Sequence, residues 1–579
     1  MNSQYLFRFS TPVILIVCLS LFYSCSQDKK DDKETIRIRI QDEPDCLNPI
    51  ISQSSLATQI ENQIMPPLFE YDGEDLEIKP ILIKELSSQK IVNDSTVAYD
   101  YQFLDEAAWE DGSKLTVKDL EFTIKAALNP YLKNKTWRNT LKNIINVESS
   151  DPSGNSFTIS INKNYFLARE MSGNYNLYPE YIYDQNKTLR HFNIPDLLNK
   201  DSAQFTIEEH QLLKSFADEF QNADHCSKLI SGAGAYKLVS WEKGSKLILE
   251  RKSNWWGDKL KSPNTLQTAF AKKIEYQVIP DDVAAIAALK NGSLDLSTLS
   301  PKQFVTLKKE NLPSLLFATP TIMQYYYIEI NNTKPGLSEK AVRLAMAHAL
   351  DQDNFIKNQM EGLATRIVGP VHPSKTFYNK SLQPYTYDID LAKKLLSDAS
   401  WKDTDQDGIL DKIVAGKKIK LAFQILVSGK DLGRNMALHL QEECKKIGIA
   451  IEIISKEGTI FQKDLQERNF DLATSVTRQS PSLWDPFQSW HSSNIQASKT
   501  NRCGFATPET DSLIQIIRTA ESEPIRNQAY LKFQEILHEN EPQIFLFSPT
   551  ERIVYSSKLK FNPTAKRPGY TENNMQKIN

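Results

Sequence analysis

The chain has 579 residues, of which 24% are charged, and its formal net charge at pH 7 is −3. This length is too great for a single hydrophobic core, so we expect two or three domains. The nearly balanced charge offers no basic field for nucleic acid, and nucleic-acid binding is therefore not expected.

The first 25 residues have the pattern of a secretory signal peptide. Arg8 precedes an apolar run over residues 9–23, which is too short for a membrane-spanning helix. A small residue then stands directly before Cys25, which resembles the cleavage site of bacterial lipoproteins, where the cysteine thiol is acylated. We therefore expect export and lipidation at Cys25. A conventional signal peptide with an incidental cysteine is the alternative.

Polar residues follow the expected lipidation site. Residues 26–34 are mostly acidic residues and lysines and have the composition of a solvated tether. Four further cysteines could form disulfides outside the cytoplasm, but four allow three pairings and the sequence does not choose among them. No Cys-x-x-Cys or Cys-x-x-His spacing suggests zinc, and no cofactor is expected. The four are Cys46, Cys226, Cys444 and Cys503.

Hydrophobic periodicity predicts most of the remaining elements. Thr116 and Asp119 have the spacing of a capping box at the start of a helix, so the acidic residues there are expected to cap the helix rather than to catalyse. The strand-helix-strand patterns over 273–296 and 418–454 predict βαβ units, and the second implies a mostly parallel sheet. Strands are expected at 35–40, 100–103, 156–161, 273–278, 294–296, 324–332, 418–426 and 449–454. Helices are expected at 54–64, from 116 onward, and at 281–290, 342–351, 391–399, 433–446 and 527–538.

Residues 232–257 contain the clearest local pattern. Two β-rich runs, 236–241 and 246–251, are separated by four residues that include a glycine, which predicts a β-hairpin. Gly232 and Gly234 before it allow backbone conformations that a side chain would resist. The Trp-Trp pair at 255–256 carries apolar area that is expected in a core.

An acidic turn lies at residues 401–411. Asp403, Asp405 and Asp407 with the following glycine have the spacing with which a calcium loop begins. Position twelve of such a loop is Val414, where a glutamate ligand belongs. A tight acidic turn without metal is therefore the preferred interpretation, and calcium binding is the alternative.

These segments, in this order, resemble the bacterial extracellular solute-binding protein family 5, the peptide-, oligopeptide- and nickel-binding lipoproteins of ABC importers. The likeness covers nearly all of residues 36–561. It is carried by Leu-Asn-Pro at 47–49, Pro-Leu-Phe-Glu-Tyr-Asp at 67–72, Trp-Glu-Asp-Gly at 109–112, the hairpin and Asn-Trp-Trp-Gly at 232–257, the strand at 324–332 and the Asp-Pro segment at 484–492.

The resemblance implies an α/β fold with the two lobes of a periplasmic binding protein of type II, in the three-domain architecture of the peptide binders. Residues 35–72, 230–322 and 545–579 would form the core of lobe I, residues 73–229 a domain inserted into it, and residues 323–544 lobe II. A hinged cleft between the lobes would close on the ligand and remove it from water, which needs no reactive group.

The resemblance also locates candidate ligand contacts. In the family's peptide binders, an aspartate three residues before the Asp-Pro pair faces the peptide amino group, and here that position is Ser482. Because a buried ligand charge needs a partner, we expect Arg478 or Asp485 to supply one, although Arg478 has the alternative of being a solvated loop residue. Three aromatic residues are expected to form apolar walls, and two residues near the N-terminus to contribute from lobe I. The predicted ligand-binding set is Glu43, Asn48, Tyr325, Tyr327, Arg478, Ser482, Trp484 and Asp485.

The sequence lacks the usual catalytic motifs, including the Gly-x-Ser-x-Gly elbow, His-Glu-x-x-His and a phosphate loop, so we do not expect an enzyme. The expected function is that of a substrate-binding lipoprotein, which would be an exported monomer anchored to a bacterial membrane and facing the periplasm or the cell surface. It would capture peptides or oligopeptides for an ABC permease of the inner membrane. Two alternatives stay open: a binder of a non-peptide solute such as a metal chelate, opine or oligosaccharide, and a surface-binding lipoprotein without a permease.

Overall fold

The computed structural model describes residues 34–52, 54–133, 136–200, 204–429, 431–496, 500–520 and 522–578. The predicted signal peptide, the lipidation site Cys25 and the tether up to residue 33 lie outside these ranges. Among the helices of the described ranges, none combines the length and the apolar character that crossing a membrane requires.

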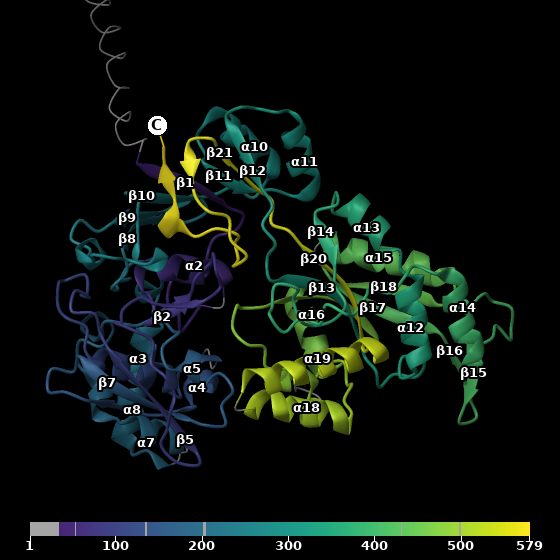
Figure 1. The fold of residues 1–579 in the computed structure, drawn as a ribbon, viewed down its shortest axis with the longest axis horizontal. Coiled ribbons are helices and arrows are strands. Elements are labelled where there is room, and N and C mark those ends of the chain that lie inside the picture. Colours follow the sequence, from purple (N-terminus) through teal and green to yellow (C-terminus); the bar gives the residue numbers. More distant parts are fainter. Residues whose placement is uncertain are drawn as a thin grey trace, which may run out of the picture.

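Two mixed sheets, one in each lobe, organise the molecule (Figure 1). The sheet of lobe I has the order β12 (Leu315–Ala318), β21 (Ile553–Ser556), β11 (Leu296–Thr298), β1 (Thr35–Ile40), β10 (Lys273–Val278), β9 (Lys246–Arg251) and β8 (Tyr236–Glu242). The sheet of lobe II has the order β14 (Ala364–Arg366), β20 (Gln543–Pro549), β13 (Gln324–Ile330), β19 (Leu472–Arg478), β17 (Ala422–Ser428) and β18 (Ala450–Lys456). With helices packed on both sheets, the chain has the predicted α/β class.

Strand β1 lies in the middle of the lobe I sheet. It pairs in parallel with both β10 and β11, so the βαβ unit predicted over 273–296 is present, with α10 (Asp282–Asn291) as its crossover. Ile38 is fully buried on one face of β1 and Arg39 is 4% exposed on the other. The Arg39 guanidinium is neutralised by Asp282 at 2.7 Å, which makes burial of the charge tolerable.

The predicted hairpin is confirmed as β8 and β9, which pair antiparallel at one edge of this sheet. The Trp-Trp pair at 255–256 is buried, as expected. The role of Gly234 is close packing rather than unusual backbone angles, because an added Cβ would lie 2.3 Å from the carbonyl oxygen of Gln63. Helix α2 (Ser55–Ile64) thus packs directly on the entry to the hairpin.

Residues 73–229, the predicted inserted domain, contain a four-stranded sheet and most of the helices of lobe I. Helix α3 begins with the predicted capping box, because the Asp119 carboxylate accepts hydrogen bonds from the Thr116 backbone N–H at 3.0 Å and from its hydroxyl at 3.1 Å. The strands are β4 (Lys90–Ile91), β5 (Thr96–Gln102), β7 (Ser156–Asn162) and β6 (Ile144–Ser149). The helices are α3 (Val117–Leu128), α4 (Thr136–Leu141), α5 (Ala168–Met171), α6 (Glu180–Tyr183), α7 (Ile194–Asn199), α8 (Ile207–Phe220) and α9 (Asp224–Ser227).

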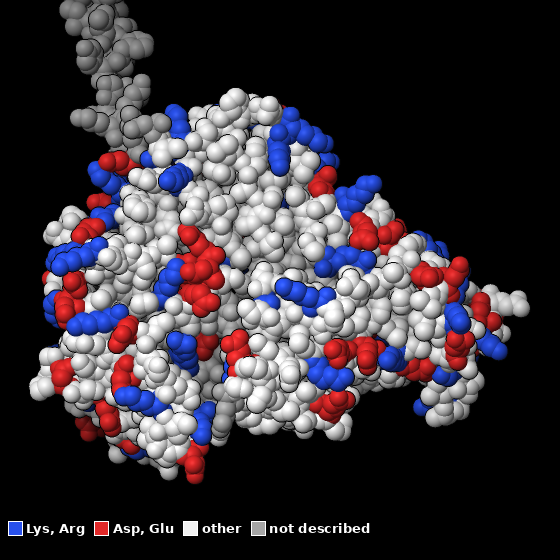
Figure 2. All heavy atoms as spheres, viewed as in Figure 1, with Lys and Arg blue, Asp and Glu red and all other residues white. Residues whose placement is uncertain are grey.

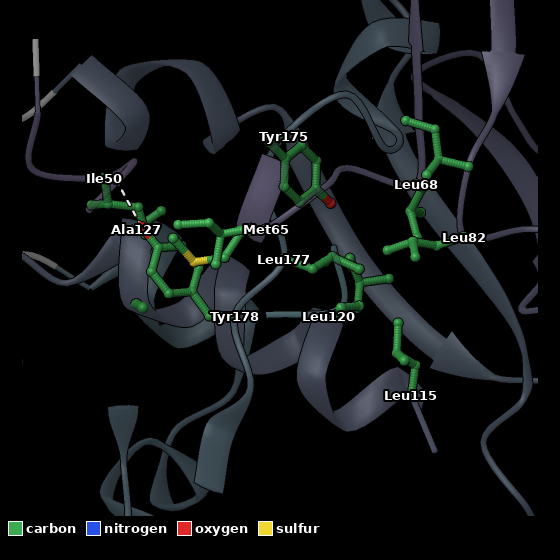
Figure 3. Close-up of a cluster of buried hydrophobic side chains, with 14 of the residues drawn as sticks. Ile50, Met65, Leu68, Leu82, Leu115, Leu120, Ala127, Tyr175, Leu177 and Tyr178 are labelled. Carbon is green, nitrogen blue, oxygen red and sulfur yellow. Dashed lines mark hydrogen bonds between the residues drawn. The ribbon is translucent and has the colours of Figure 1, made fainter. Parts of the chain in front are cut away.

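One continuous hydrophobic core joins this domain to the rest of lobe I (Figure 3). Met65 and Leu68 follow helix α2, whereas Leu120 and Leu177 belong to the inserted domain, and all four are fully buried. A shared core of this kind favours movement of the two parts as one body.

A disulfide and a backbone hydrogen bond close the base of the inserted domain. Cys46 and Cys226 are bonded to each other, and the Leu47 N–H donates to the Cys226 carbonyl at 2.8 Å. Cys444 and Cys503 are buried free thiols in lobe II. The structure therefore joins two of the four cysteines and leaves the other two unpaired, so none of the three full pairings is formed.

The lobe II sheet differs from the prediction in strand direction. Strands β17 and β18 pair in parallel around α15 (Asp431–Lys445), which confirms the βαβ unit. However, the pairs β13–β19, β13–β20 and β14–β20 are antiparallel, so the expected mostly parallel sheet is wrong. The reason is that β13 and β20 are long-range strands that enter and leave the lobe, and their direction is not a property of the local βαβ pattern.

Two further expectations for lobe II need correction. The predicted strand 418–426 is two strands, because β16 (Lys417–Lys420) forms a hairpin with β15 (Asp411–Val414) before β17 enters the main sheet. Residues 545–549 belong to β20 in the lobe II sheet, although the prediction placed them in lobe I. Strand β20 is buried along its whole length, which fits a central strand of lobe II.

The remaining elements surround these sheets. Lobe I also contains α11 (Pro301–Lys309) and the short strands β2 (Phe69–Tyr71), β3 (Ile78–Pro80), β22 (Leu559–Lys560) and β23 (Gln576–Lys577). Lobe II also contains α12 (Lys340–Ala349), α13 (Gln352–Gln359), α14 (Ile389–Asp398), α16 (Gly458–Glu467), α17 (Phe487–Trp490), α18 (Pro508–Thr519) and α19 (Glu523–Asn540).

The chain crosses between the lobes in two adjacent segments, residues 319–323 and 550–552. They are held together by an isolated antiparallel bridge between Thr321 and Thr550, and by the Glu551 N–H, which donates to the Pro320 carbonyl at 2.8 Å. Two neighbouring extended connections have the form of a hinge.

Candidate ligand-binding cleft

A cleft of ≈ 890 Å³ lies between the two lobes. Lobe I contributes side chains from residues 71–99 and 163–170, and lobe II contributes side chains from residues 374–377, 481–483 and 518–526. In Figure 1 this places the cleft between the inserted domain and helices α18 and α19. Ligand pockets range from about 300 to about 1,000 Å³, so this cleft has the size of a ligand site.

The face of the molecule in Figure 2 carries acidic and basic side chains in alternation, with no large area of one sign. The cleft repeats this balance. Its lining acids are Asp75, Glu77, Glu170 and Glu523, and its lining bases are Lys163, Arg169, Lys375, Arg518 and Arg526. A cleft of this composition suits a ligand that carries both positive and negative groups.

The lobe I wall has a half-buried carboxylate at its centre. Glu170 lies on the short helix α5, and its Oε1 accepts a hydrogen bond from the Tyr71 hydroxyl at 2.7 Å. Burial and the neighbouring Glu170 charge both raise the pKa of the Tyr71 hydroxyl, which keeps this donor protonated. The adjacent Tyr165 and Phe166 supply aromatic surface on the same wall.

The lobe II wall has a buried ammonium group opposite. Lys375 is 6% exposed, and its Nζ donates hydrogen bonds to the backbone carbonyls of Ser480 and Ser482. Burial lowers the pKa of Lys375 to about 8, partly offset by the negative charge of Glu170. The lysine therefore fixes the 480–482 loop and places a positive charge at the cleft.

Two arginines complete the lobe II wall. Arg518, at the end of α18, forms an ion pair with Asp485 at 3.3 Å and lies 4.3 Å from the centroid of the Phe487 ring. Arg526, in the first turn of α19, donates to the carbonyls of Ile517 at 3.2 Å and Ala520 at 2.7 Å, so it caps the end of α18. Its guanidinium also lies 6.0 Å from the ring centroid of Phe166 in lobe I, which brings the lobes into contact.

The structure places all eight predicted ligand-binding residues outside the set that lines the cleft. Glu43 accepts hydrogen bonds from the Trp241 indole at 3.3 Å and from the Gly244 N–H at 2.9 Å, and so supports the hairpin. Asn48 is fully buried, and its Oδ1 accepts from the Tyr178 hydroxyl at 2.7 Å. Figure 3 shows Tyr178 beside Ile50, whose N–H donates to the same hydroxyl at 2.9 Å.

The three predicted aromatic walls form the core behind the cleft. Tyr325 and Tyr327 are buried on the face of β13 that packs against α18 and α19. Trp484 joins the same cluster, and its carbonyl accepts a hydrogen bond from the Tyr530 hydroxyl. They support Phe377 and Leu483, which belong to this cluster and do line the cleft.

The last three predicted residues lie near the lobe II wall without lining it. Arg478 is exposed at the end of β19, and its Nε donates to Gln324 at 3.4 Å. Ser482 offers its backbone carbonyl to Lys375 rather than its side chain to the cleft. Asp485 orients Arg518, and its own carboxylate accepts the Phe487 N–H at 3.0 Å.

The sequence analysis missed the charged residues that the cleft does contain. Glu170 and Lys375 lie in segments without a motif, and 205 positions separate them along the chain. Arg518 and Arg526 fall in helical patterns, where a charged residue usually marks a solvated face. Only the segment around residue 482 gave a usable signal, because the adjacent Pro481 and Leu483 line the cleft.

The acidic turn of lobe II lies outside the cleft lining, and two lysines offset part of its charge. Asp405 pairs with Lys418 at 2.8 Å and with Lys420 at 2.9 Å. The Asp403 carboxylate accepts the N–H groups of Asp407 and Gly408 at 3.1 and 2.9 Å. Carboxylate oxygens of Asp403, Asp405 and Asp411 lie within 4.8 Å of one another, an arrangement that could hold a cation, so calcium binding stays the alternative to a structural turn.

The hinge, the two lobes and the cleft between them define a two-lobed solute-binding protein. The model of the bacterial extracellular solute-binding proteins, family 5 Middle, matches residues 77–500, and the chain belongs to this family. The family consists of solute-binding proteins, whose members are extracellular or periplasmic.

Two relatives show the range of the similarity. Oligopeptide-binding protein AppA of Bacillus subtilis (strain 168) is 26% identical over 530 residues, which cover 90% of this chain and 88% of the relative. The nickel-binding periplasmic protein of Escherichia coli (strain K12) is 25% identical over 44% of this chain and 47% of the relative.

Solved structures confirm the predicted fold. The structure of AppA from Bacillus subtilis in complex with a nonapeptide matches with a TM-score of 0.70 at 23% identity, covering 94% of this chain and 99% of that one. NikZ from Campylobacter jejuni in complex with Ni(L-His) matches with the same TM-score and identity, covering 94% of this chain and 100% of that one. The fold is therefore shared by binders of different solutes, and the ligand must be argued from the cleft.

Proposed function

We propose that this chain captures peptides in the interlobe cleft as the substrate-binding component of an ABC importer. The observation that carries the proposal is a peptide-sized cleft with charged groups of both signs on facing walls. A free peptide has an amino group, a carboxylate and a polar backbone, so it matches such walls. The oligopeptide-binding relatives support the same assignment.

Binding in this proposal is capture without chemistry. The ligand enters while the lobes are apart, and rotation about the 319–323 and 550–552 segments brings the walls together. Closure excludes water and strengthens each polar contact, because the local dielectric falls. Release to an inner-membrane permease then requires reopening of the same hinge, and no residue acts as a catalyst.

We further propose export and lipid anchoring at Cys25, with the protein working as a monomer. The Cys46–Cys226 disulfide supports export, since disulfides persist in oxidising compartments. Metabolic labelling with a palmitate analogue tests the anchor: the native chain takes up label, and the Cys25→Ala variant does not. Equal labelling of both chains would exclude Cys25 as the acylated residue.

A thermal-shift series tests the binding function. The soluble form that starts after Cys25 is heated alone and with trialanine, pentaalanine, a nickel–histidine chelate and maltotriose. A ligand at 100 times its Kd stabilises the native state by about 2.7 kcal/mol, so a binder raises the melting temperature. Stabilisation by the alanine peptides supports the proposal. Stabilisation by the chelate or the sugar alone would replace peptides with a non-peptide solute.

A further inference from the structure

The acids that line the cleft differ in how far they are buried and in whether a cation neutralises them. Among the four lining acids, Asp75, Glu77 and Glu523 are exposed, whereas Glu170 is half-buried. Asp75 also has a cation of its own, because it pairs with Lys79 at 2.8 Å. Within the described residues, the Glu170 carboxylate forms no ion pair.

The lobe II wall shows the opposite pattern. Lys375 is buried and has no carboxylate partner among the described residues. Its ammonium has three N–H donors, and two are used by the carbonyls of Ser480 and Ser482. Asp485, behind that wall, is already paired with Arg518 at 3.3 Å, and Glu523, the lining acid of lobe II, is exposed. An incoming ammonium group would therefore meet a like charge on this wall.

Glu170 and Lys375 belong to different lobes and are close enough for the charge of one to act on the pKa of the other. They do not form an ion pair with each other in this arrangement of the lobes. Each buried charge needs a partner when the cleft closes and water leaves, because an uncompensated buried charge costs several kcal/mol. A ligand with two opposite charges can supply both partners at once.

We propose that the cleft orients a zwitterionic ligand, with its amino group against Glu170 on lobe I and its carboxylate against Lys375 on lobe II. This assignment rests on the proposed peptide-binding function and deepens it. Tyr71 holds the Glu170 carboxylate in place through the hydrogen bond of 2.7 Å. The backbone clamp at Ser480 and Ser482 holds the Lys375 ammonium. The wall on which Ser482 lies thus selects the ligand's negative end.

Titration calorimetry with three forms of one peptide tests the orientation. Trialanine, N-acetyl-trialanine and trialanine amide are measured against the unmodified soluble chain and against the Glu170→Gln and Lys375→Gln variants. Loss of one charge-assisted contact is worth about 10-fold to 100-fold in Kd. The unmodified chain should therefore prefer free trialanine to either blocked form by that factor.

The variants separate the two ends of the ligand. Glu170→Gln should bind free and N-acetylated peptide equally while still discriminating against the amide. Lys375→Gln should bind free trialanine and trialanine amide equally while still discriminating against the acetylated peptide. Lys375→Arg should restore the preference for a free carboxylate. Glu148, an exposed acid on β6 of the inserted domain outside the cleft lining, is the matched control, and Glu148→Gln should leave both preferences unchanged.

Three results would overturn the orientation. If Glu170→Gln still discriminates against the acetylated peptide, or Glu148→Gln no longer discriminates against it, the amino group is held elsewhere. If the unmodified chain binds free and blocked peptides alike, peptide capture stands and this orientation is wrong. If no form binds, the orientation falls together with the proposed function. Melting temperatures of the unliganded variants show whether a variant has lost its fold. Glu170→Gln is expected close to the unmodified chain, whereas Lys375→Gln is expected lower because it weakens the hold on the 480–482 loop.

Discussion

Glu329 is a buried carboxyl in the middle of the lobe II sheet. Its Oε1 accepts a hydrogen bond from the Gln543 amide at 2.6 Å, and its other oxygen lies 3.5 Å from the Tyr327 hydroxyl. Burial raises the pKa of Glu329 to about 7, since the charged form loses its hydration. The folded chain therefore holds a proton that the unfolded chain releases at lower pH.

Because the folded chain binds this proton and the unfolded chain releases it, we expect the stability to depend on pH. Between the ordinary carboxyl pKa of about 4.3 and about 7, the native state binds more protons than the unfolded state, so the stability contribution of Glu329 falls as pH rises. We expect Glu329 to contribute a drop of up to about 3 kcal/mol in the free energy of unfolding across this window, and Glu329→Gln to remove that contribution from the slope. Urea denaturation at pH 5, 6, 7 and 8 measures it.

The matched control for this measurement is Glu452→Gln, because Glu452 is an exposed carboxylate on β18. It should retain the pH dependence of the unmodified chain. An unchanged slope in Glu329→Gln would mean that another buried carboxyl, such as Glu572, carries the effect, since burial raises its pKa as well.

At the scale of elements, the hairpin β8–β9 depends on Glu43, which was predicted from the sequence to bind the ligand. Glu43 joins the loop before α2 to the hairpin turn through Trp241 and Gly244. We expect Glu43→Ala to lower the free energy of unfolding by about 1 to 3 kcal/mol, the range for hydrogen bonds to a charged group. Peptide affinity should stay unchanged.

Chemical denaturation and calorimetry on the same variant check both parts. The isosteric Glu43→Gln is the control. Both hydrogen bonds end on Oε2, so an amide oxygen in its place can still accept them and should keep most of the stability. A loss of affinity in Glu43→Ala without a loss of stability would mean that Glu43 contacts the ligand, as the sequence predicted.

Elements that depend on local sequence were predictable, and those that depend on distant partners were not. The hairpin, the capping box at Thr116 and the βαβ units follow from turn residues and periodicity over short stretches. The direction of β13 relative to β20 depends on segments more than 200 positions apart, so local patterns say nothing of it. The split of residues 418–426 was hidden for a related reason, because both halves have strand composition.

The whole molecule explains why the candidate site was harder to predict than the fold. Motif residues such as Asn48 and Tyr325 pack inside the lobes, so they are buried and do not line the cleft. The cleft walls arise only when two lobes meet, and their charged residues come from loops and helix ends such as Glu170 and Arg526. The fold is shared across the family, whereas these surface positions are free to differ.

The disulfide acts at the same scale, because its loop contains the whole inserted domain. Cys46 and Cys226 are separated by 180 residues, and closing so long a loop restricts the unfolded chain strongly. We expect the Cys46→Ala/Cys226→Ala double variant to lose about 2 to 5 kcal/mol of stability. Denaturation with and without reductant measures this, and Cys444→Ala, which removes a buried free thiol, controls for cysteine loss in general. A double variant as stable as the oxidised chain would contradict the expectation.

Closure of the lobes is the last property that the structure makes testable. Phe166 belongs to lobe I but packs against the lobe II cluster that contains Tyr530 and Phe533, and Arg526 lies over its ring. This contact forms only when the lobes approach, so Phe166→Ala should shift the equilibrium toward the open form. Because the ligand enters the open form, the association rate for trialanine should hold while the dissociation rate rises about 5-fold to 30-fold, which corresponds to about 1 to 2 kcal/mol.

Stopped-flow kinetics separates the two rates, and small-angle scattering at saturating trialanine reports the average separation of the lobes. Phe270→Ala is the control, because Phe270 is a 53% exposed phenylalanine of lobe I outside the cleft lining. It should change neither rate. A slower association with an unchanged dissociation rate in Phe166→Ala would place Phe166 at the entrance of the cleft instead of in the closing contact. Closure would then depend on the 319–323 and 550–552 segments without a contribution from Phe166.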